Sequence, residues 1–500
     1  MISTNLRAVA GLLGLAGLLC GCAVGPDFHL PPKPTQKAYR PAGEAAAAGE
    51  QQFALGKRIT GDWWKLFHSG PLDHVVQQAI GGNRTLVAAK ATLAQAEQAR
   101  IQASGGLFPQ VDLGASAARQ KISPSQFGLQ KLPAGFPPIF NLFSIGPRVS
   151  YALDIFGETR RGIEEAGALA EAANYEVDAA YLTLTGQAVT EAFTIAEINA
   201  EIRTIEGIIA DDQTNLRLVN AEVKAGTATQ LDIETATSQL EADRTLLPPL
   251  RQQLSQTRHA LAILGGKAPI DWTPPAFDLA AFTLPKDLPV SLPSALVQQR
   301  PDVLTAQARL HAASAAIGVA TAQLYPRLDI TAAFNQDTTK INQLFWGSSS
   351  AWSVASGLTA PIFHGGELVA QRRAAIAAYD ASLANYQQTV LLSFGQVADA
   401  LDALQNDAAL IESERRAIRS GEASLRLTRQ TYSIGNIGIL QVVDAQRQVE
   451  QARLGLVRAE AQRLIDTAQL FLAMGGGWWQ WQGDHAPPAS AGKPAVKATP

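Results

Sequence analysis

A proline-free stretch from Gly365 to Gly475 constrains the fold of this 500-residue chain more than any other sequence feature. It is rich in helix-favouring Ala, Leu, Gln, Glu and Arg. Its apolar residues recur about every 3.5 residues, as in a coiled-coil seam. Segment 433–438 contains two glycines and predicts a tight turn between two helices. The first arm, 366–432, would be about 100 Å long. No globular core is that deep, so the hairpin must project and pack against similar hairpins.

The same pattern occurs earlier in the chain, which indicates an internal duplication. Residues 160–224 form another proline-free run, and the turn glycines Gly226 and Gly435 are 209 residues apart. Further matches pair Leu107-Phe108-Pro109-Gln110 with Leu324-Tyr325-Pro326-Arg327, Ile155-Phe156 with Ile362-Phe363, and Leu264-Gly265-Gly266 with Met474-Gly475-Gly476. Chain length alone would suggest about three domains, but a repeat of this size indicates two copies of one unit instead. We therefore expect two copies of one large structural unit, with additional segments at both ends of the chain.

The expected organisation is two repeats, each with a β-hairpin and long helices, joined by a proline-rich linker. The predicted parts are a signal peptide with a lipobox (1–22), an extended N-terminal arm (23–71), the first repeat (72–266), the linker (267–293), the second repeat (294–475) and a C-terminal tail (476–500). In the first repeat we expect a β-hairpin at 109–156 and helices at 84–104, 160–224 and 228–264. In the second we expect a β-hairpin at 326–363 and helices at 302–323, 366–432 and 439–474.

Two further sequence features bear on the expected fold. Pro248-Pro249 interrupts the returning arm 228–264, and proline inside a helix costs about 3 kcal/mol or more, so the arm should break or kink there. The paired Trp63-Trp64 is expected to pack against the body of the protein; a ligand-stacking role is the alternative.

Composition argues against several functional classes. The net charge is −3 without a long basic run, so nucleic-acid binding has little electrostatic support. The seven histidines are scattered without metal-ligand spacing, and no nucleophile elbow or phosphate loop is present. We predict no catalytic residue, no metal site and no cofactor beyond a covalent lipid. No internal segment reaches the eighteen or more unbroken apolar residues of a membrane-spanning helix.

The N-terminal residues predict a signal sequence that ends in a lipid attachment site. Arg7 precedes an apolar run, and then Leu19-Cys20-Gly21-Cys22 resembles a bacterial lipobox with its small residue before Cys22. We expect lipid, palmitate included, on Cys22. An ordinary cleaved signal with an incidental cysteine is the alternative. Ala23 follows Cys22. An Asp at this position would resemble the signal that retains lipoproteins in the inner membrane, so its absence favours the outer membrane.

Alternating apolar and polar residues predict two long β-hairpins. Val111, Leu113, Ala115 and Ala117 alternate with more polar neighbours, and the pattern returns at Val149, Tyr151, Leu153 and Ile155. The second hairpin repeats it at Leu328, Ile330, Ala332 and Phe334, and then at Trp352, Val354 and Leu358. Strands of about ten residues with one apolar face suit a membrane β-barrel, although a soluble sheet with one buried face is the alternative. Four strands cannot close a barrel alone, whereas three chains would supply twelve.

Several short motifs, in their order along the chain, resemble one known family. They are Cys22-Ala23-Val24-Gly25-Pro26-Asp27-Phe28, Trp63-Trp64 with Phe67, Arg300-Pro301-Asp302-Val303, Ile317-Gly318-Val319-Ala320, Tyr325-Pro326, Ala360-Pro361-Ile362-Phe363, Asp444-Ala445-Gln446-Arg447 and Gly475-Gly476-Gly477-Trp478. Together they resemble the TolC-like outer-membrane efflux factors, in particular the NodT-type lipoprotein branch of RND tripartite efflux systems. The resemblance covers almost the whole chain.

This resemblance implies a mainly α fold with a membrane β-barrel. A homotrimer would form a 12-stranded β-barrel in the outer membrane, continued by a 12-helix periplasmic α-barrel with a mixed equatorial region. It implies a passive exit duct for drugs or other small compounds. Its partners would be a periplasmic adaptor (membrane fusion) protein and an inner-membrane RND transporter, with outer-membrane lipid around the barrel. The protein would be anchored in the outer membrane by lipid and extend into the periplasm.

The resemblance also implies a gate at the periplasmic helix tips. Asp444 resembles the aspartate that rings the aperture, and Leu440 resembles its apolar constriction. Tyr432 and Arg447 resemble the residues that tie neighbouring hairpins together. Leu440, Asp444 and Arg447 stand at i, i+4 and i+7 and so share one helix face, and three aspartates around an axis would favour cations. The alternative for Asp444 is a solvated carboxylate that stabilises the first turn of the helix starting near Ile439.

The first repeat lacks these gate residues. At the same offset it has Thr235 in place of Asp444 and Ser238 in place of Arg447, so we expect an asymmetric gate. Asp232 and Glu234 add negative charge nearby, with no role assigned. Two other functions stay open: a lipid-anchored coiled-coil spacer or adhesin, which would not need the β-hairpins, and a protein-secretion duct of the same family.

Overall fold

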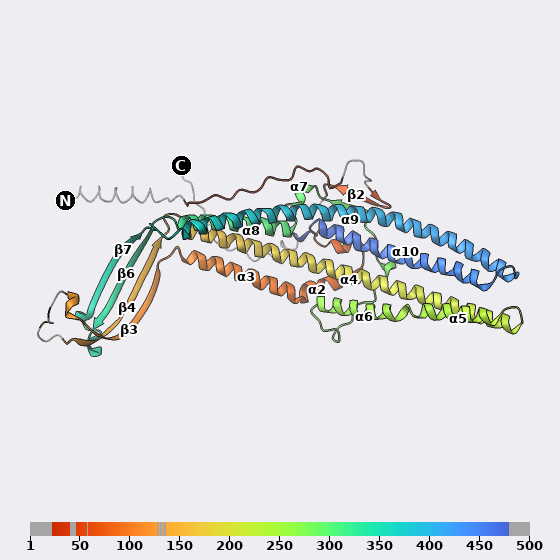
Figure 1. Ribbon diagram of the computed structural model, residues 1–500, viewed down its shortest axis with the longest axis horizontal. Coiled ribbons are helices and arrows are strands. Elements are labelled where there is room, and N and C mark those ends of the chain that lie inside the picture. The colour runs from red at the N-terminus through yellow and green to blue at the C-terminus, as the bar shows by residue number, and fades with distance from the viewer. Residues whose placement is uncertain are drawn as a thin grey trace. The chain divides into compact units, whose positions relative to one another are not determined.

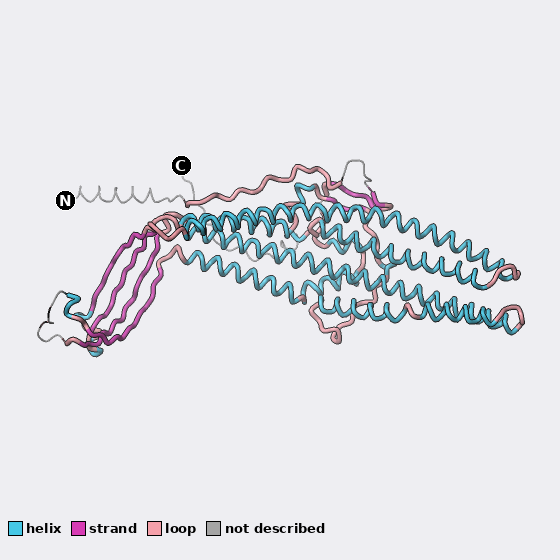
Figure 2. The backbone as a smooth tube through the Cα atoms, in the orientation of Figure 1, coloured by secondary structure: helices cyan, strands magenta, loops and turns pink. Residues whose placement is uncertain are grey.

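The computed structural model describes residues 23–40, 47–57, 59–127, 130, 133 and 137–479. It divides into two compact units. The first contains residues 23–31 together with Thr92–Ala173 and Ala306–Tyr386, and the second contains Pro32–Ala91, Asn174–Thr305 and the chain from Gln387 onward. Figure 1 labels the elements along the chain, and Figure 2 separates helices from strands. Cys22, the predicted lipid attachment residue, lies outside the described residues.

The first unit is built on a four-stranded antiparallel sheet in the order β3-β4-β6-β7 (Figure 2). Its strands are β3 (Gln110–Lys121), β4 (Ile139–Leu153), β6 (Arg327–Thr338) and β7 (Ser350–Thr359). β3 pairs with β4 and β6 pairs with β7, so each alternating region of the sequence forms a hairpin. β4 and β6 join the hairpins, with Tyr151 opposite Ile330. Within the described chain, β3 and β7 are therefore the two edge strands.

The second unit is mainly helical and contains two long hairpins. α4 (Glu158–Lys224) begins in the first unit and returns as α5 (Gln230–Arg244) and α6 (Leu247–Leu264). α9 (Glu367–Ser433) returns as α10 (Ile439–Ala473), and Figure 1 shows each pair side by side. The second unit also contains α2 (Gly70–Gly82), α7 (Pro293–Leu296) and short 3-10 turns at Trp63–Phe67 and Leu279–Ala281. α3 (Arg84–Gly105) and α8 (Pro301–Ala322) lie mainly in the first unit, which also contains the 3-10 turns Pro124–Phe127, Ile341–Gln343 and Gly347–Ser349. No helix in the described part of the chain is long and apolar enough to cross a bilayer.

The arm predicted as one helix over 228–264 is two helices. α5 ends at Arg244 and α6 begins at Leu247, so that Pro248 stands in its first turn. Proline is tolerated there because the N–H groups of a first turn have no partner inside the helix. The break that Pro248-Pro249 predicts is thus confirmed, and it falls just before the prolines.

A small three-stranded sheet joins two segments expected to be irregular. β2 (Gln51–Leu55), in the predicted extended arm, pairs in parallel with β5 (Asp287–Val290), in the predicted linker, and β1 (Ala47–Ala48) pairs antiparallel with β2. Both main strands are too short to give a clear alternation, and their partners lie more than 230 residues apart. Local sequence patterns carry no signal for such a pairing.

The core of the second unit is aromatic at its centre. Trp63, Trp64 and Phe67 are fully buried, which confirms that the paired tryptophans pack against the body. The Phe67 ring lies 4.9 Å from Phe193 and 6.2 Å from Phe471, both edge-on. Edge-to-face aromatic pairs add about 0.5–1.5 kcal/mol beyond the area that they bury. This cluster fixes the 3-10 turn at Trp63–Phe67 against α4 and α10.

Candidate functional site: an apolar sheet face and the hairpin tips

One face of the four-stranded sheet is predominantly apolar on all four strands, although Gln336, Ser350 and Ser356 also belong to it. Because side chains alternate along each strand, the observed register assigns residues to the two faces. Val111, Val149, Ala332 and Val354 are aligned across the four strands and so share one face. The same face carries Leu113, Ile145, Pro147, Tyr151, Leu153, Leu328, Ile330, Phe334, Trp352 and Leu358, whereas the other carries Asp112, Ser116, Arg148, Ser150, Asp329, Thr331, Asn335 and Ser353.

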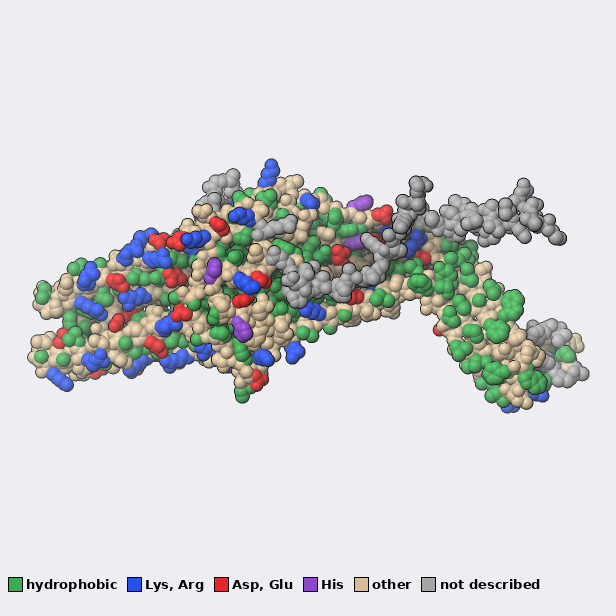
Figure 3. Space-filling model, turned by 180° about the vertical axis from the view of Figure 1, so that it is seen from behind, with side chains coloured by type: hydrophobic (Ala, Val, Ile, Leu, Met, Phe, Trp, Pro, Cys, Tyr) green, Lys and Arg blue, Asp and Glu red, His purple; other side chains and the backbone are tan. Residues whose placement is uncertain are grey.

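The apolar face is open to its surroundings in the single chain. Leu113, Trp352 and Val354 are 74%, 77% and 68% exposed. Figure 3 shows hydrophobic side chains gathered over the strands and charged side chains over the helices. Soluble monomers rarely expose a contiguous apolar surface of this extent, so the face marks contact with a membrane or a partner.

The two helical hairpins turn through glycines with left-handed backbone. Gly226 has φ +78° and Gly435 has φ +76°, a conformation that costs other residues free energy. α5 then begins with a capping box in which the Asp232 carboxylate accepts hydrogen bonds from the Thr229 N–H at 2.7 Å and its hydroxyl at 2.8 Å. Glu234 accepts a hydrogen bond from Gln230 Nε2 at 3.1 Å. Both carboxylates therefore make local contacts that hold the helix start.

Leu440, Asp444 and Arg447 lie on the exposed side of α10 just after its turn. Leu440 is 56% exposed, and the side chains of Asp444 and Arg447 are 54% and 50% exposed. Arg447 Nη2 lies 3.9 Å from Asp444 Oδ1. The first turn of α10 contains no acidic residue, since Asp444 stands five residues beyond Ile439. The helix dipole acts mainly within the first turn, so Asp444 is too far along α10 to contribute much to stabilising the start of the helix.

Tyr432 and Arg447 both reach from the α9–α10 hairpin to the α4–α5 hairpin of the same chain. The Tyr432 hydroxyl donates to Glu222 Oε2 on α4 at 2.5 Å. Arg447 Nη2 donates to Gln239 Oε1 on α5 at 3.2 Å. Burial and the neighbouring Glu222 carboxylate raise the pKa of Tyr432 above its ordinary value, so the phenol stays protonated and remains a donor.

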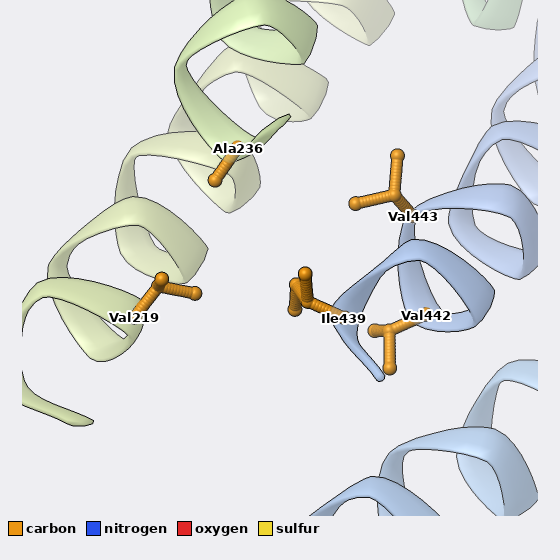
Figure 4. Close-up of a cluster of buried hydrophobic side chains, with 5 residues drawn as sticks. All are labelled: Val219, Ala236, Ile439, Val442 and Val443. Carbon is orange, nitrogen blue, oxygen red and sulfur yellow. The ribbon is translucent and has the colours of Figure 1, made fainter. Parts of the chain in front are cut away.

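An apolar cluster lies beneath these polar contacts. Figure 4 shows Val219 of α4 and Ala236 of α5 facing Ile439 and Val443 of α10. Tyr432 and Leu425 pack against the same cluster. Each of its five core members is at least about nine-tenths buried. The two hairpins are therefore joined at their tips by apolar packing as well as by hydrogen bonds.

Residue spacing did not reveal several of the contacts at the tips. Glu222 and Gln239 gave no signal, because each is an ordinary polar residue of a long helix. Gln446 belongs to the Asp444-Ala445-Gln446-Arg447 motif but had no role of its own. In the structure Gln446 is 5% exposed and donates from Nε2 to Asp212 Oδ1 at 2.8 Å. The described residues include no group of three or more His, Cys, Asp or Glu able to hold a metal ion.

The model of the family described as outer membrane efflux protein matches residues 75–267 and 292–476. The chain belongs to the outer membrane efflux protein family. This efflux protein is therefore an outer-membrane channel component and not an enzyme, as the sequence predicted.

Relatives of this efflux protein match over nearly their whole length. The pyoverdine export outer membrane protein OpmQ of Pseudomonas putida is 29% identical over 467 residues, covering 93% of this chain and 97% of the relative. The toluene efflux pump outer membrane protein TtgF of Pseudomonas putida is 29% identical over 473 residues, covering 93% and 96%. The solved outer-membrane channel OprN has a TM-score of 0.83 and 27% identity, covering 91% of this chain and 100% of OprN.

Proposed function

We propose that three copies of this efflux protein form the exit duct of a tripartite efflux pump. The apolar face across β3, β4, β6 and β7, with its two open edges, carries this proposal. An open sheet edge is not tolerated in lipid, so the sheet needs partners on both sides. Three copies would supply twelve strands, an even number within the range of such barrels. Closed ring symmetry satisfies an edge-to-edge contact of this kind.

The long hairpins would continue the duct into the periplasm. In this proposal the two repeats each contribute one helical hairpin, and three copies form a 12-helix tube with a mixed equatorial region. The periplasmic adaptor and the inner-membrane RND transporter would meet this end and supply energy and selectivity. Relatives are named for export of pyoverdine, toluene and antibiotics. This range supports a passive duct for small compounds rather than a protein-secretion duct or an anchored spacer.

The proposed lipid anchor is Cys22, which would carry the protein's covalent lipid, palmitate included. Support comes from the sequence Leu19-Cys20-Gly21-Cys22 alone. The next described residues make ordered contacts: the Val24 N–H donates to Phe156 O at 3.0 Å, and Arg161 Nη2 lies 2.7 Å from Asp27 Oδ1. An anchored N-terminus would thus be connected directly to the junction of β4 and α4.

The barrel proposal is tested by placing one charge on either face of β7. Val354→Arg puts a cation on the apolar face, where it would cost about 2–4 kcal/mol per copy near the bilayer midplane. Ser353→Arg places the same group on the opposite face, which would line water. We expect the Val354 variant to lose heat-modifiable trimers from outer-membrane fractions and the Ser353 variant to keep them. Equal assembly of both variants would favour a sheet that does not meet lipid.

We propose that the hairpin tips form the gate, with Leu440 and Asp444 lining its aperture and Tyr432 and Arg447 holding it closed. Tyr432→Phe removes only the hydroxyl that bonds Glu222, a charge-assisted bond worth about 1.5–3 kcal/mol. We expect planar-bilayer openings to become roughly tenfold more frequent. Tyr379→Phe makes the same change in α9 away from the tip and should behave as the unmodified protein. Equal opening in both variants would remove Tyr432 from the gate.

A further inference from the structure

A buried pair of carboxyl groups lies behind the tips, between α4 and α5. Asp212 is 4% exposed and Asp243 is 9% exposed, and the two side chains are within hydrogen-bonding reach of each other. Asp212 Oδ1 accepts a hydrogen bond from Gln446, but Oδ2 has no donor among the described residues. Two carboxylates cannot donate to each other, and a buried oxygen without a donor is costly. One proton on the pair would satisfy this oxygen.

The charges around the pair also favour a proton. Buried Glu450 on α10, whose own pKa is raised by burial, adds negative charge when it is ionised, as does exposed Asp211 on α4. The nearby cations point elsewhere: Arg429 of α9 donates to Gln446 Oε1 at 3.3 Å, and Arg447 of α10 donates to Gln239. Neither contacts the Asp212 carboxyl through a described hydrogen bond or ion pair. Burial, the Asp243 carboxyl and the Glu450 charge raise the pKa of Asp212 far above its ordinary range.

A chain of hydrogen bonds connects this pair to the proposed gate. Gln239 Nε2 donates to Asp243 Oδ2 at 2.7 Å, and Gln239 Oε1 accepts from Arg447 at 3.2 Å. Arg447 in turn lies 3.9 Å from Asp444. On the other side of the pair, Gln446 belongs to the same helix as Arg447. The position of Arg447 therefore depends on the spacing between α4, α5 and α10 around the carboxyl pair.

We propose that Asp212 and Asp243 share one proton that positions Arg447 through Gln239 and keeps the tip closed. The proposal rests on the proposed gate and adds its regulation. Loss of the proton leaves adjacent buried anions beside Glu450, and they are relieved when the helices separate and admit water. The folded-state pKa of Asp212 lies above the ordinary aspartate value. The stabilisation is therefore complete at low pH and is lost as pH rises through the folded-state pKa. The tip should loosen under alkaline conditions.

The test combines hydrogen–deuterium exchange at the tips with bilayer conductance, both as a function of pH. Between about pH 6 and about pH 9 we expect tip exchange, corrected for its intrinsic pH dependence, and conductance each to rise roughly tenfold. Asp212→Asn should flatten both profiles at the low level, because a neutral amide donates to Asp243 at every pH. Asp211→Asn removes the same charge from the adjacent exposed residue and should keep the steep profile.

Asp243→Asn changes the other member of the pair, on α5, so it should also flatten the pH profile of tip exchange. A profile that stays steep in Asp212→Asn, or flattens in only one of the two variants, would overturn the shared proton. If the unmodified protein conducts at no pH while the exchange profile still flattens in both variants, the shared proton stands and the channel proposal fails. Exchange thus separates the two proposals, because it does not require a conducting pore.

Discussion

Replacement of Asp444 by alanine is expected to enlarge single-channel conductance about fivefold and to abolish cation selectivity. In the proposed trimer, three half-exposed carboxylates would surround a narrow axis just beyond the turn of α10. Each would interact with a passing ion by about 1 kcal/mol in a watery environment, attracting cations and repelling anions. Alanine would remove this ring and also the partner 3.9 Å from Arg447, so the aperture should both widen and lose its charge.

The measurement is planar-bilayer recording under a salt gradient, which gives conductance and ion selectivity together. Asp380→Ala is the matched control, because it removes an exposed carboxylate from α9 away from the tips. Conductance equal to that of the unmodified protein would keep the channel but place the gate elsewhere. No conductance from a folded trimer, with or without Asp444, would instead favour the anchored spacer.

Replacement of Phe67 by alanine is expected to destabilise the protein by about 3–5 kcal/mol. The ring is fully buried and lies against Phe193, Phe471 and Trp63, so its removal leaves a cavity among rigid aromatic neighbours. The cost arises from lost burial and from a void that the surrounding helices cannot close. The shift should appear as a lower unfolding temperature of the detergent-solubilised protein.

Phe345→Ala is the control for this core substitution, because Phe345 is 78% exposed in the single chain. A surface change of this kind usually alters the free energy of unfolding by no more than about 0.5 kcal/mol. A similar loss of stability in both variants would mean that the aromatic cluster does not stabilise the second unit as its burial indicates.

The long helical hairpins, their turns and the strands of the four-stranded sheet could be predicted from sequence because each depends on local backbone geometry. Apolar spacing of about 3.5 residues predicts the long helix over 366–432, which corresponds to α9, and Gly435 supplies the left-handed turn that follows. Strict alternation around Val111 and Trp352 predicts strands, since successive side chains point to opposite faces. The motif Asp444-Ala445-Gln446-Arg447 brought the tip residues to attention through resemblance to a family. None of these inferences required knowledge of distant contacts.

Only the tertiary structure decided which distant residues meet. The pairing of β4 with β6, the parallel pairing of β2 with β5 and the bond from Tyr432 to Glu222 each join segments more than 170 residues apart. The burial of Asp212 beside Asp243 was equally hidden, because an aspartate on a long polar helix looks the same whether it faces water or another carboxyl. The physical reason is that periodicity records only which side of an element is apolar. Partner choice and desolvation arise when the chain closes and fixes the spacing between its helices.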